Sequence, residues 1–369
     1  MVKILITSVG SLVGQNILDS LQDRRADIEV VGVNSLASAA GNFRCDRCYL
    51  APSAVIFDAY QDRLHSILCE ERPDLVLPGR DDDVVVLAAI KEAAPSFCAA
   101  IPVGPLSIAN VLDDKWASHE FAAVHGLPYV DTALADDLPA VRQVASLHGF
   151  PLIAKPRRGN GSRGTRVVFD DAQCAAVGKL DGYVLQQYVQ PEPEVLRSRQ
   201  GDGAGVPLFY APVLQQIVSQ AVIGPDGQVR ELFCTFIDLV MGRAERIVWL
   251  DDVEVKETTR RYAEAVAAVG WVGALNVQGR RDKEGTFLVY ELNGRVSGGT
   301  MARLLLGFDE VGMLFESFTG RTIPPSSKGI GTHGIVTKSL VDFTTEPNSI
   351  ADLQSLGKWQ RAKSSGART

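Results

Sequence analysis

The first hundred residues alternate short apolar runs with amphipathic stretches, and this alternation constrains the fold more than any other feature of the chain. The apolar runs at residues 3–7, 30–33 and 74–78 predict buried strands. An amphipathic helix is predicted at residues 57–70, before the last of these strands. Strands that alternate with helices in this way form a parallel sheet with helices on both faces. We therefore predict an α/β protein that begins with a doubly wound sheet.

Length, charge and cysteine content limit the class of protein. At 369 residues, two or three lobes with substantial hydrophobic cores are expected. The net charge of -7, without runs of like charge, disfavours nucleic acid as a partner. No apolar stretch approaches the roughly 20 residues of a membrane span, and the first residues lack a signal-peptide pattern. Six scattered cysteines indicate a reducing compartment, so we expect a cytoplasmic protein with no membrane partner.

Two turns of the N-terminal part raise the question of a ligand. Residues 10–14 have the glycine spacing G-x-x-x-G, whereas a dinucleotide site has G-x-G-x-x-G. Such a site also has an acidic residue after the second strand, where this chain has Asn34. An NAD-dependent oxidoreductase that uses this part alone is therefore disfavoured, although it stays an alternative. Residues 80–83, Arg-Asp-Asp-Asp, are either a ligand loop at the sheet edge or an acidic helix N-terminus.

After the N-terminal part, the pattern changes to strands that are predicted to pair with the next strand along the chain. Residues 152–155 and 166–169 are predicted as a hairpin that holds a glycine-rich loop. Residues 190–208 are rich in Pro, Gly and charge and predict an inserted loop or lid. The polar tail after residue 343 is predicted to be disordered. The other predicted elements are a helix beginning at residue 113, helices at residues 138–148 and 255–269, and strands at residues 183–189, 213–223, 231–239, 273–279 and 286–293.

The loop at residues 159–164 has the composition of a phosphate-binding loop. Its small residues let backbone N–H groups approach an anion closely, and its serine adds a hydroxyl. The residues concerned are Gly159, Gly161, Ser162 and Gly164. A Walker A loop is disfavoured, because Thr165 stands where that motif has lysine and a strand follows instead of a helix. The lysine lies upstream at Lys155, where a strand can hold it beside phosphates, and an ordinary flexible loop is the alternative.

A second chemical signal lies at the end of the last predicted strand. Side chains alternate along a strand, so Glu291, Asn293 and Arg295 project to one side, and Tyr290 is predicted to face the core. Gln278 on the preceding strand can add a carbonyl oxygen. Carboxylate and amide oxygens are the ligands that Mg²⁺ uses when phosphates complete its shell, and Arg295 would then reach the terminal phosphate. The alternative is a solvated polar strand end.

Taken together, these segments resemble the ATP-grasp superfamily, in the style of the synthetase units of carbamoyl phosphate synthase large subunits and related carboxylate-amine ligases. The matching segments are Asp114-Lys115, Pro151-x-x-x-Lys155-Pro156, residues 159–164, Gln186-Gln187-Tyr188-Val189, Asn276-Val277-Gln278 and residues 291–297. The resemblance covers about residues 1–325 and implies a Rossmann-like pre-ATP-grasp domain followed by a two-lobed ATP-grasp fold. The implied boundaries are 1–109 for the pre-ATP-grasp domain, 110–189 for the small lobe, 190–342 for the large lobe with its insertion at 190–208, and 343–369 for the tail.

The resemblance also implies roles for individual residues. The implied contacts are Lys115 and Lys155 with ATP phosphates, Gln187, Tyr188 and Val189 with adenine, Glu194 with ribose, Gln278, Glu291 and Asn293 with Mg²⁺ or Mn²⁺, and Arg295 with the transferred phosphoryl group. Lys155 and Arg295 would then be the catalytic residues. The chain departs from the family at two places. Members commonly carry Glu in the place of Gln187, and they have proline in the place of Gly294.

The activity implied by this resemblance is an ATP-dependent ligation. A carboxylate attacks the γ-phosphate, and an amine then displaces phosphate to give an amide or peptide bond, with ADP as the other product. The implied partners are a small carboxylate and a small amine, and a homodimer is the commonest default. Residues 297–300, Ser-Gly-Gly-Thr, either bind the acyl substrate or cap a helix. A non-catalytic nucleotide-binding regulatory protein is the remaining alternative.

Overall fold

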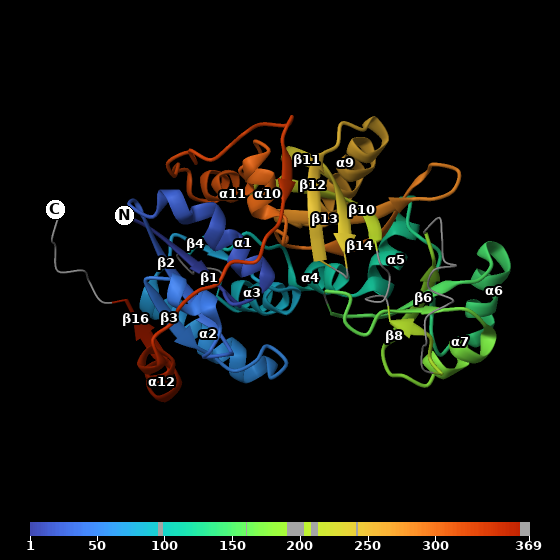
Figure 1. Cartoon of the computed structure of the whole chain (residues 1–369), viewed down its shortest axis with the longest axis horizontal. Coiled ribbons are helices and arrows are strands. Elements are labelled where there is room, and N and C mark those ends of the chain that lie inside the picture. The colour runs from blue at the N-terminus through green and yellow to red at the C-terminus, as the bar shows by residue number, and fades with distance from the viewer. Residues whose placement is uncertain (95–98, 160, 190–202, 208–212, 241–242, 362–369) are drawn as a thin grey trace.

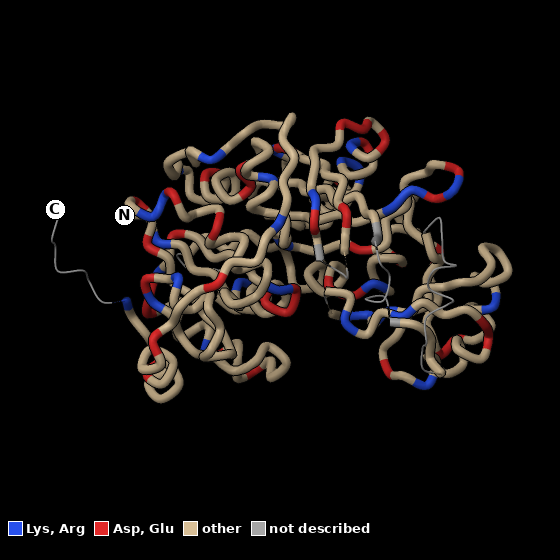
Figure 2. Tube along the Cα trace, viewed as in Figure 1, with Lys and Arg blue, Asp and Glu red and all other residues tan. Residues whose placement is uncertain are grey.

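The computed structural model describes residues 1–94, 99–159, 161–189, 203–207, 213–240 and 243–361, which form an α/β protein with three β-sheets. In Figure 1 the N-terminal sheet lies at the left, the large antiparallel sheet in the middle and the small sheet at the right. Figure 2 shows acidic and basic residues interspersed over all three regions. Within the described ranges, every helix is too short or too polar to span a bilayer.

The N-terminal sheet has the strand order β16-β3-β2-β1-β4 and contains the predicted parallel core. Its first elements are β1 (Val2–Ile6), α1 (Leu12–Leu21), η1 (Gln22–Arg24), β2 (Ile28–Asn34), η2 (Ala40–Arg44), β3 (Arg47–Leu50), α2 (Phe57–Glu71), β4 (Leu75–Leu77) and α3 (Asp81–Ala93). Strand β1 pairs in parallel with β2 and β4. Its Leu5 packs with α2 and α3, whereas Ile4 and Ile6 pack with α1. Both faces of the sheet are therefore covered, which confirms the predicted fold class.

The C-terminal segment returns to this sheet. Helix α12 (Pro347–Leu356) buries Leu353, and strand β16 (Lys358–Gln360) pairs antiparallel with β3. The Trp359 ring lies edge-on to Phe43, with ring centroids 5.2 Å apart. The prediction of a disordered tail is therefore wrong for residues 347–360, because the segment supplies an edge strand that its polar composition hides. The end of the tail, residues 362–369, lies outside the described residues.

The small sheet has the strand order β5-β8-β6-β7-β9. Its strands are β5 (Thr132–Leu134), β6 (Leu152–Pro156), β7 (Arg166–Val168), β8 (Tyr183–Gln187) and β9 (Val206–Pro207). The helices of this region are α5 (Lys115–Val124), α6 (Leu138–His148) and α7 (Asp171–Val177), whereas the preceding helix α4 (Leu106–Asp113) packs against α3. Strands β6 and β7 form the predicted antiparallel hairpin around the glycine-rich loop. Of the predicted insertion at residues 190–208, only residues 203–207 are described.

The large sheet has the strand order β14-β13-β10-β11-β12-β15 and is antiparallel throughout. Its elements are β10 (Val213–Ile223), β11 (Val229–Val240), β12 (Arg243–Trp249), α9 (Val253–Ala268), β13 (Gly273–Arg281), β14 (Phe287–Asn293), α10 (Thr300–Leu305), α11 (Glu310–Thr319) and β15 (Ile335–Thr337). Helix α9 packs on this sheet through buried side chains such as Val255, Tyr262 and Val266. The sequence predicted strands β13 and β14, which are neighbours in this sheet, and β14 is one of its two edge strands.

Candidate functional site

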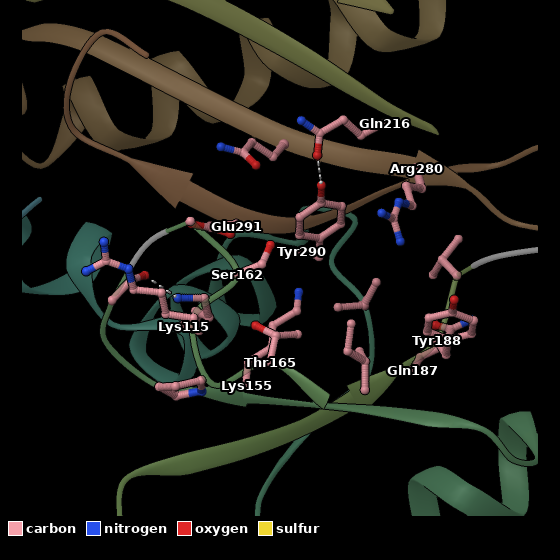
Figure 3. Close-up of a pocket in the computed structure, with 18 of the residues that line it drawn as sticks. Lys115, Lys155, Ser162, Thr165, Gln187, Tyr188, Gln216, Arg280, Tyr290 and Glu291 are labelled. Carbon is pink, nitrogen blue, oxygen red and sulfur yellow. Dashed lines mark hydrogen bonds between the residues drawn. The ribbon is translucent and has the colours of Figure 1, made fainter. Parts of the chain in front are cut away.

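A pocket lies between the small sheet and the large sheet (Figure 3). Its small-sheet side consists of Lys115, Val130, Ile153, Lys155, Pro156, Gly159, Gly161, Ser162, Arg163, Thr165, Gln187, Tyr188 and Val189. Its large-sheet side consists of Gln216, Leu239, Gln278, Arg280, Tyr290 and Glu291. Two segments far apart in the sequence therefore meet at one pocket.

Most of the predicted site residues line this pocket. They are Lys115, Lys155, Gly159, Gly161, Ser162, Gln187, Tyr188, Val189, Gln278 and Glu291. Gly164, Asn293 and Arg295 are not among the lining residues. Glu194, predicted to contact ribose, lies outside the described residues.

Lys155 is held on β6 inside the pocket. Its side chain is buried, and its Nζ lies 4.2 Å from the centroid of the Tyr290 ring. Burial lowers the pKa of Lys155 to about 7, Glu291 acts in the opposite direction, and nearby Lys115 and Arg280 lower it further. The pocket therefore concentrates positive charge, and among the described residues that line it Glu291 is the one carboxylate that offsets this charge. Such a site suits an anionic ligand.

Lys115 enters the pocket from the first turn of α5. Asp114 caps this helix by accepting from the backbone N–H groups of Trp116 and Ala117. Arg157 binds the same carboxylate through two hydrogen bonds of 3.1 and 2.7 Å. The Nζ of Lys115 donates to the carbonyl oxygen of Gly159 at 3.1 Å (Figure 3). The predicted helix beginning at residue 113 therefore begins at Lys115, and its start is attached to the glycine-rich loop.

The glycine-rich loop uses backbone conformations that side chains rarely adopt. Gly161 has φ 64° and Ser162 has φ 57°, both in the left-handed region. A Cβ at Gly161 would meet open space, so only the conformation favours glycine there. A Cβ at Gly164 would lie 2.7 Å from the hydroxyl of Tyr183, so this glycine is also required by close packing. Gly164 thus shapes the loop without lining the pocket.

The opposite end of the pocket is more apolar. Tyr188 and Val189, which follow β8, line it together with Ile153 and Leu239. Burial raises the pKa of Tyr188, so its hydroxyl stays protonated at neutral pH. Gln187 contributes an uncharged side chain where the resemblance led us to expect glutamate. This end of the pocket therefore offers apolar side chains beside the uncharged groups of Gln187 and Tyr188, and Arg280 is close enough to Tyr188 to act on it electrostatically.

Tyr290 lines the pocket, and the prediction that it faces the core is wrong. The pairing of β13 and β14 shifts register here, because Gln278 pairs with Glu291 whereas Gly279 pairs with Val289. Tyr290 is the extra residue of a β-bulge, which interrupts the alternation of side chains. Its hydroxyl donates to Gln216 Oε1 at 2.8 Å (Figure 3). Strict alternation along β14 could not predict this position.

The predicted cation ligands lie on neighbouring strands. Gln278 pairs directly with Glu291, and Asn276 pairs with Asn293. Asn293 is 3% exposed, its Oδ1 accepts from Arg295 at 3.2 Å, and its Nδ2 has no partner among the described residues. The residues that the structure describes contain no group of three or more His, Cys, Asp or Glu that could hold a metal. Glu291 and Gln278, which line the pocket, fit Mg²⁺, which takes few protein oxygens and completes its shell with phosphates and water. Asn293 lies outside the pocket lining and its Oδ1 is bonded to Arg295, so its predicted contact with the ion would require a change of partner.

Arg295 does not line the pocket. Its Nη2 forms an ion pair of 2.6 Å with Asp81 of α3, and both side chains are buried. Two atoms of this pair, Arg295 Nε and Asp81 Oδ1, lack partners among the described residues. The predicted contact of Arg295 with a terminal phosphate would therefore require a change of partner. Sequence reasoning missed Asp81 in this role, because it lies in a different part of the fold.

Residues 80–83 and 297–300, for which the sequence left two interpretations open, both lie at the start of a helix. Asp81, Asp82 and Asp83 occupy the first turn of α3, as the helix-terminus alternative predicts. Ser297 Oγ accepts from both terminal nitrogens of Arg303 at 3.1 Å. Thr300 Oγ1 donates to the carbonyl of Ser297 at 2.8 Å, just where α10 begins. The hydroxyls of residues 297–300 are thus used inside the fold, which favours the helix start over an acyl-substrate site.

Arg280 is a pocket residue that sequence reasoning missed. It follows Gln278 by two positions on β13, so the period of a strand could have placed both on one face. Its Nε donates to the carbonyl of Gln215 at 2.9 Å, and its guanidinium lies 5.5 Å from the centroid of the Tyr290 ring. Lys155 and Arg280 therefore both contact the Tyr290 ring system.

No family model matches the chain. It is 27% identical to the carbamoyl phosphate synthase large chain of Mycobacterium sp. strain JLS over 214 residues, which are 54% of this chain and 17% of that protein. The match thus spans less than a fifth of the curated relative.

Two solved structures share the fold. The biotin carboxylase domain dimer of Hydrogenobacter thermophilus 2-oxoglutarate carboxylase, in complex with MgADP, ADP and bicarbonate, has a TM-score of 0.63 at 15% identity and covers 91% of this chain and 73% of that one. L-amino acid ligase from Bacillus licheniformis has a TM-score of 0.60 at 17% identity and covers 86% of this chain and 74% of that one. The sequence match and the shared fold together show that the chain belongs to the ATP-grasp superfamily, with distant homology to the carbamoyl phosphate synthase large chain.

Proposed function

We propose that this protein is an ATP-dependent ligase, which activates a carboxylate as an acyl phosphate and couples it to an amine. The observation that carries the proposal is the pocket in which Lys115, Lys155 and Arg280 face Gln278 and Glu291. Cationic side chains suit the phosphates of ATP, and the oxygen donors suit the metal ion that accompanies them. The L-amino acid ligase with this fold supports the coupling of a carboxylate to an amine.

The nucleotide is proposed to lie along the pocket. Its phosphates would contact Lys115, Lys155 and the loop with Gly159, Gly161, Ser162 and Gly164. Its adenine would lie at Gln187, Tyr188 and Val189, where the pocket is apolar. Gln278, Glu291 and Asn293 would hold Mg²⁺, and Mn²⁺ also suits such oxygen ligands. When bound, the ion neutralises charge on the phosphate oxygens.

The proposed reaction needs little covalent help from the protein. A carboxylate oxygen of the substrate forms a bond to the γ-phosphorus of ATP, and the bond from that phosphorus to the β-γ bridging oxygen breaks, so ADP leaves. The amine nitrogen then bonds to the acyl carbon, phosphate leaves with the acyl C–O electron pair, and the amine loses a proton. Lys155 would hold the phosphates in place for the first step.

Arg295 is our candidate for contact with the transferred phosphoryl group. Its present partner is the Asp81 carboxylate at 2.6 Å, so the role requires that phosphate replaces Asp81. Guanidinium groups bind carboxylate and phosphate with the same two-pronged geometry. Because Asp81 belongs to the N-terminal sheet region, this exchange would link the reaction to that part of the molecule.

The proposal is tested by measuring ADP release across paired small carboxylic acids and amino acids, with mass spectrometry of any condensed product. We expect ADP release that needs Mg²⁺ and one particular pair of substrates. Glu291→Ala is the matched inactive control. ADP binding without ADP formation for any pair would instead support a non-catalytic nucleotide-binding protein. A homodimer is also proposed, since the biotin carboxylase domain with this fold is a dimer, and light scattering measures it directly.

A further inference from the structure

We infer that Arg303, Gln220 and Asn276 are positioning residues, which hold the side-chain amide of Gln278 with its carbonyl oxygen turned toward the pocket. The inference rests on the proposed function, because it concerns how one proposed cation ligand is oriented. The carbonyl and amino ends of a glutamine side chain have nearly the same shape. Only hydrogen-bond partners can therefore decide which end faces a cation.

The series of hydrogen bonds begins at Arg303, a group that can only donate hydrogen bonds. Arg303 forms an ion pair of 2.6 Å with Glu310, and the side chains are 1% and 0% exposed. A guanidinium has only donors and does not lose its charge in proteins. Its Nη2 lies 3.2 Å from an end of the Gln220 side chain, which must therefore be the carbonyl oxygen Oε1.

This assignment determines the orientation of Asn276. Gln220 Oε1 accepts a second hydrogen bond from Asn276 Nδ2 at 3.1 Å, while Gln220 Nε2 donates to the carbonyl of Arg295 at 3.3 Å. Asn276 Nδ2 also donates to the carbonyl of Ser219 at 3.2 Å. If the Asn276 amide were reversed, its oxygen would face two other oxygens.

The orientation then passes to Gln278. Asn276 Oδ1 accepts from Gln278 Nε2 at 3.0 Å. Because the amino end of Gln278 is engaged inside the protein, its carbonyl end is left for the pocket that this residue lines. A hard cation binds oxygen and is repelled by an amino group.

The network acts without touching a ligand. Gln220 and Asn276 are directly paired on β10 and β13, both are 0% exposed, and neither lines the pocket. They would act on bound metal only through Gln278. In metal sites such outer partners commonly matter about 10- to 100-fold for affinity.

The test uses the full chain and measures ADP affinity by calorimetry, with Mg²⁺ and with EDTA. Asn276→Leu has a similar size but cannot accept from Gln278. We expect it to weaken ADP binding in Mg²⁺ by about 10- to 100-fold and to change binding in EDTA by less than about twofold. Equal effects in the two conditions, or no effect, would overturn the inference.

The Gln278→Glu background is the decisive control. A carboxylate has oxygen at both ends, so it needs no partner to select one. We expect Asn276→Leu to leave the Mg²⁺ dependence of ADP binding unchanged in that background. An equal loss in both backgrounds would mean that Asn276 only supports the sheet, and the inference would be wrong.

A second pair of variants serves if Asn276→Leu does not fold. Gln220→Glu keeps an oxygen facing Arg303 and Asn276, whereas Gln220→Leu removes it. We expect the Mg²⁺ effect on ADP binding to survive in Gln220→Glu and to fall in Gln220→Leu, and the same fall in both would contradict the inference. Failure of the unaltered protein to bind ADP would instead contradict the proposed function.

Discussion

The two walls of the pocket are built differently. The small-sheet wall carries Lys155 and its glycine residues on one hairpin and its loop, with Lys115 added from α5, and a Cβ at Gly159 or Gly161 would meet no atom within 4 Å. The large-sheet wall is supported from behind by buried polar groups, and Asn276 and Asn293 are 0% and 3% exposed. The first wall has room to adjust to a ligand, whereas the second is a rigid platform. We infer that the loop wall surrounds the phosphates and that the sheet wall fixes the geometry of the reaction.

If the large-sheet wall carries the metal, removal of its carboxylate should have the largest effect. Glu291→Ala is expected to reduce ADP formation by on the order of 10³-fold, because no other carboxylate lines the pocket among the described residues. Steady-state ADP release measures this. The exposed Glu284→Ala is the control, and its side chain is 61% exposed. Similar rates of ADP release for the two variants would contradict a metal site on the large-sheet wall.

The rigid wall also depends on the buried pair of Arg295 and Asp81. Asp81→Asn is expected to destabilise the protein by about 2–3 kcal/mol, because it removes a charged hydrogen bond of 2.6 Å between buried groups. The free energy of unfolding in urea measures this. The exposed pair of Lys283 and Glu284 offers a comparison, and Glu284→Gln should cost less than about 1 kcal/mol. Equal values for the two variants would contradict a stabilising role for Asp81.

Gly161 and Gly164 both have a left-handed backbone conformation, but an added side chain should meet close neighbours only at Gly164. Gly164→Ala is expected to lower stability by about 2 kcal/mol, because its Cβ would lie 2.7 Å from the Tyr183 hydroxyl and φ is 72°. Gly161→Ala has a similar φ of 64° but open space, so about 1 kcal/mol is expected. Melting temperatures measure the difference. A larger loss of stability in Gly161→Ala than in Gly164→Ala would contradict the open space found around Gly161.

The smallest expected effect is a pH dependence of binding at Lys155. The pKa of this lysine is lowered to about 7 by burial, and a bound phosphate would raise it, so binding takes up a proton. ADP affinity should therefore be strongest below pH 7 and fall as the pH rises above 7, by at most about tenfold per pH unit. Calorimetry at several pH values measures this slope. Lys155→Arg stays charged and should abolish the slope, and an unchanged slope would assign it to another group.

Local signals predicted much of the fold and of the pocket. The hairpin around Lys155 and the strands that carry Gln278 and Glu291 follow from apolar period and turn residues alone. Strand β3 was not predicted, because four residues with an arginine at the start carry little periodic signal. The tail strand β16 was not predicted either, since its hydrogen bonds depend on a partner far away in the sequence.

Gly294 shows the same limit at a single residue. The resemblance led us to expect proline there, and sequence alone offered no reason for glycine. In the structure a Cβ at this position would lie 2.5 Å from the ring of Trp271, which is fully buried. Tyr290 is a second case, because the register shift between β13 and β14 brings it into the pocket. Both positions are explained by residues that are distant in the sequence and become neighbours only in the folded structure.

From the sequence alone we could predict the order of many of the elements, the glycine-rich loop with its lysine, and candidate oxygen ligands on two neighbouring strands. These features are local, because propensity and side-chain period act over a few residues. Three features could be seen only in the folded molecule: Arg295 pairs with Asp81, Tyr290 and Arg280 line the pocket, and Gln278 is bonded to a buried amide. Each of these contacts joins separate strands or helices, so close packing and buried hydrogen bonds select it.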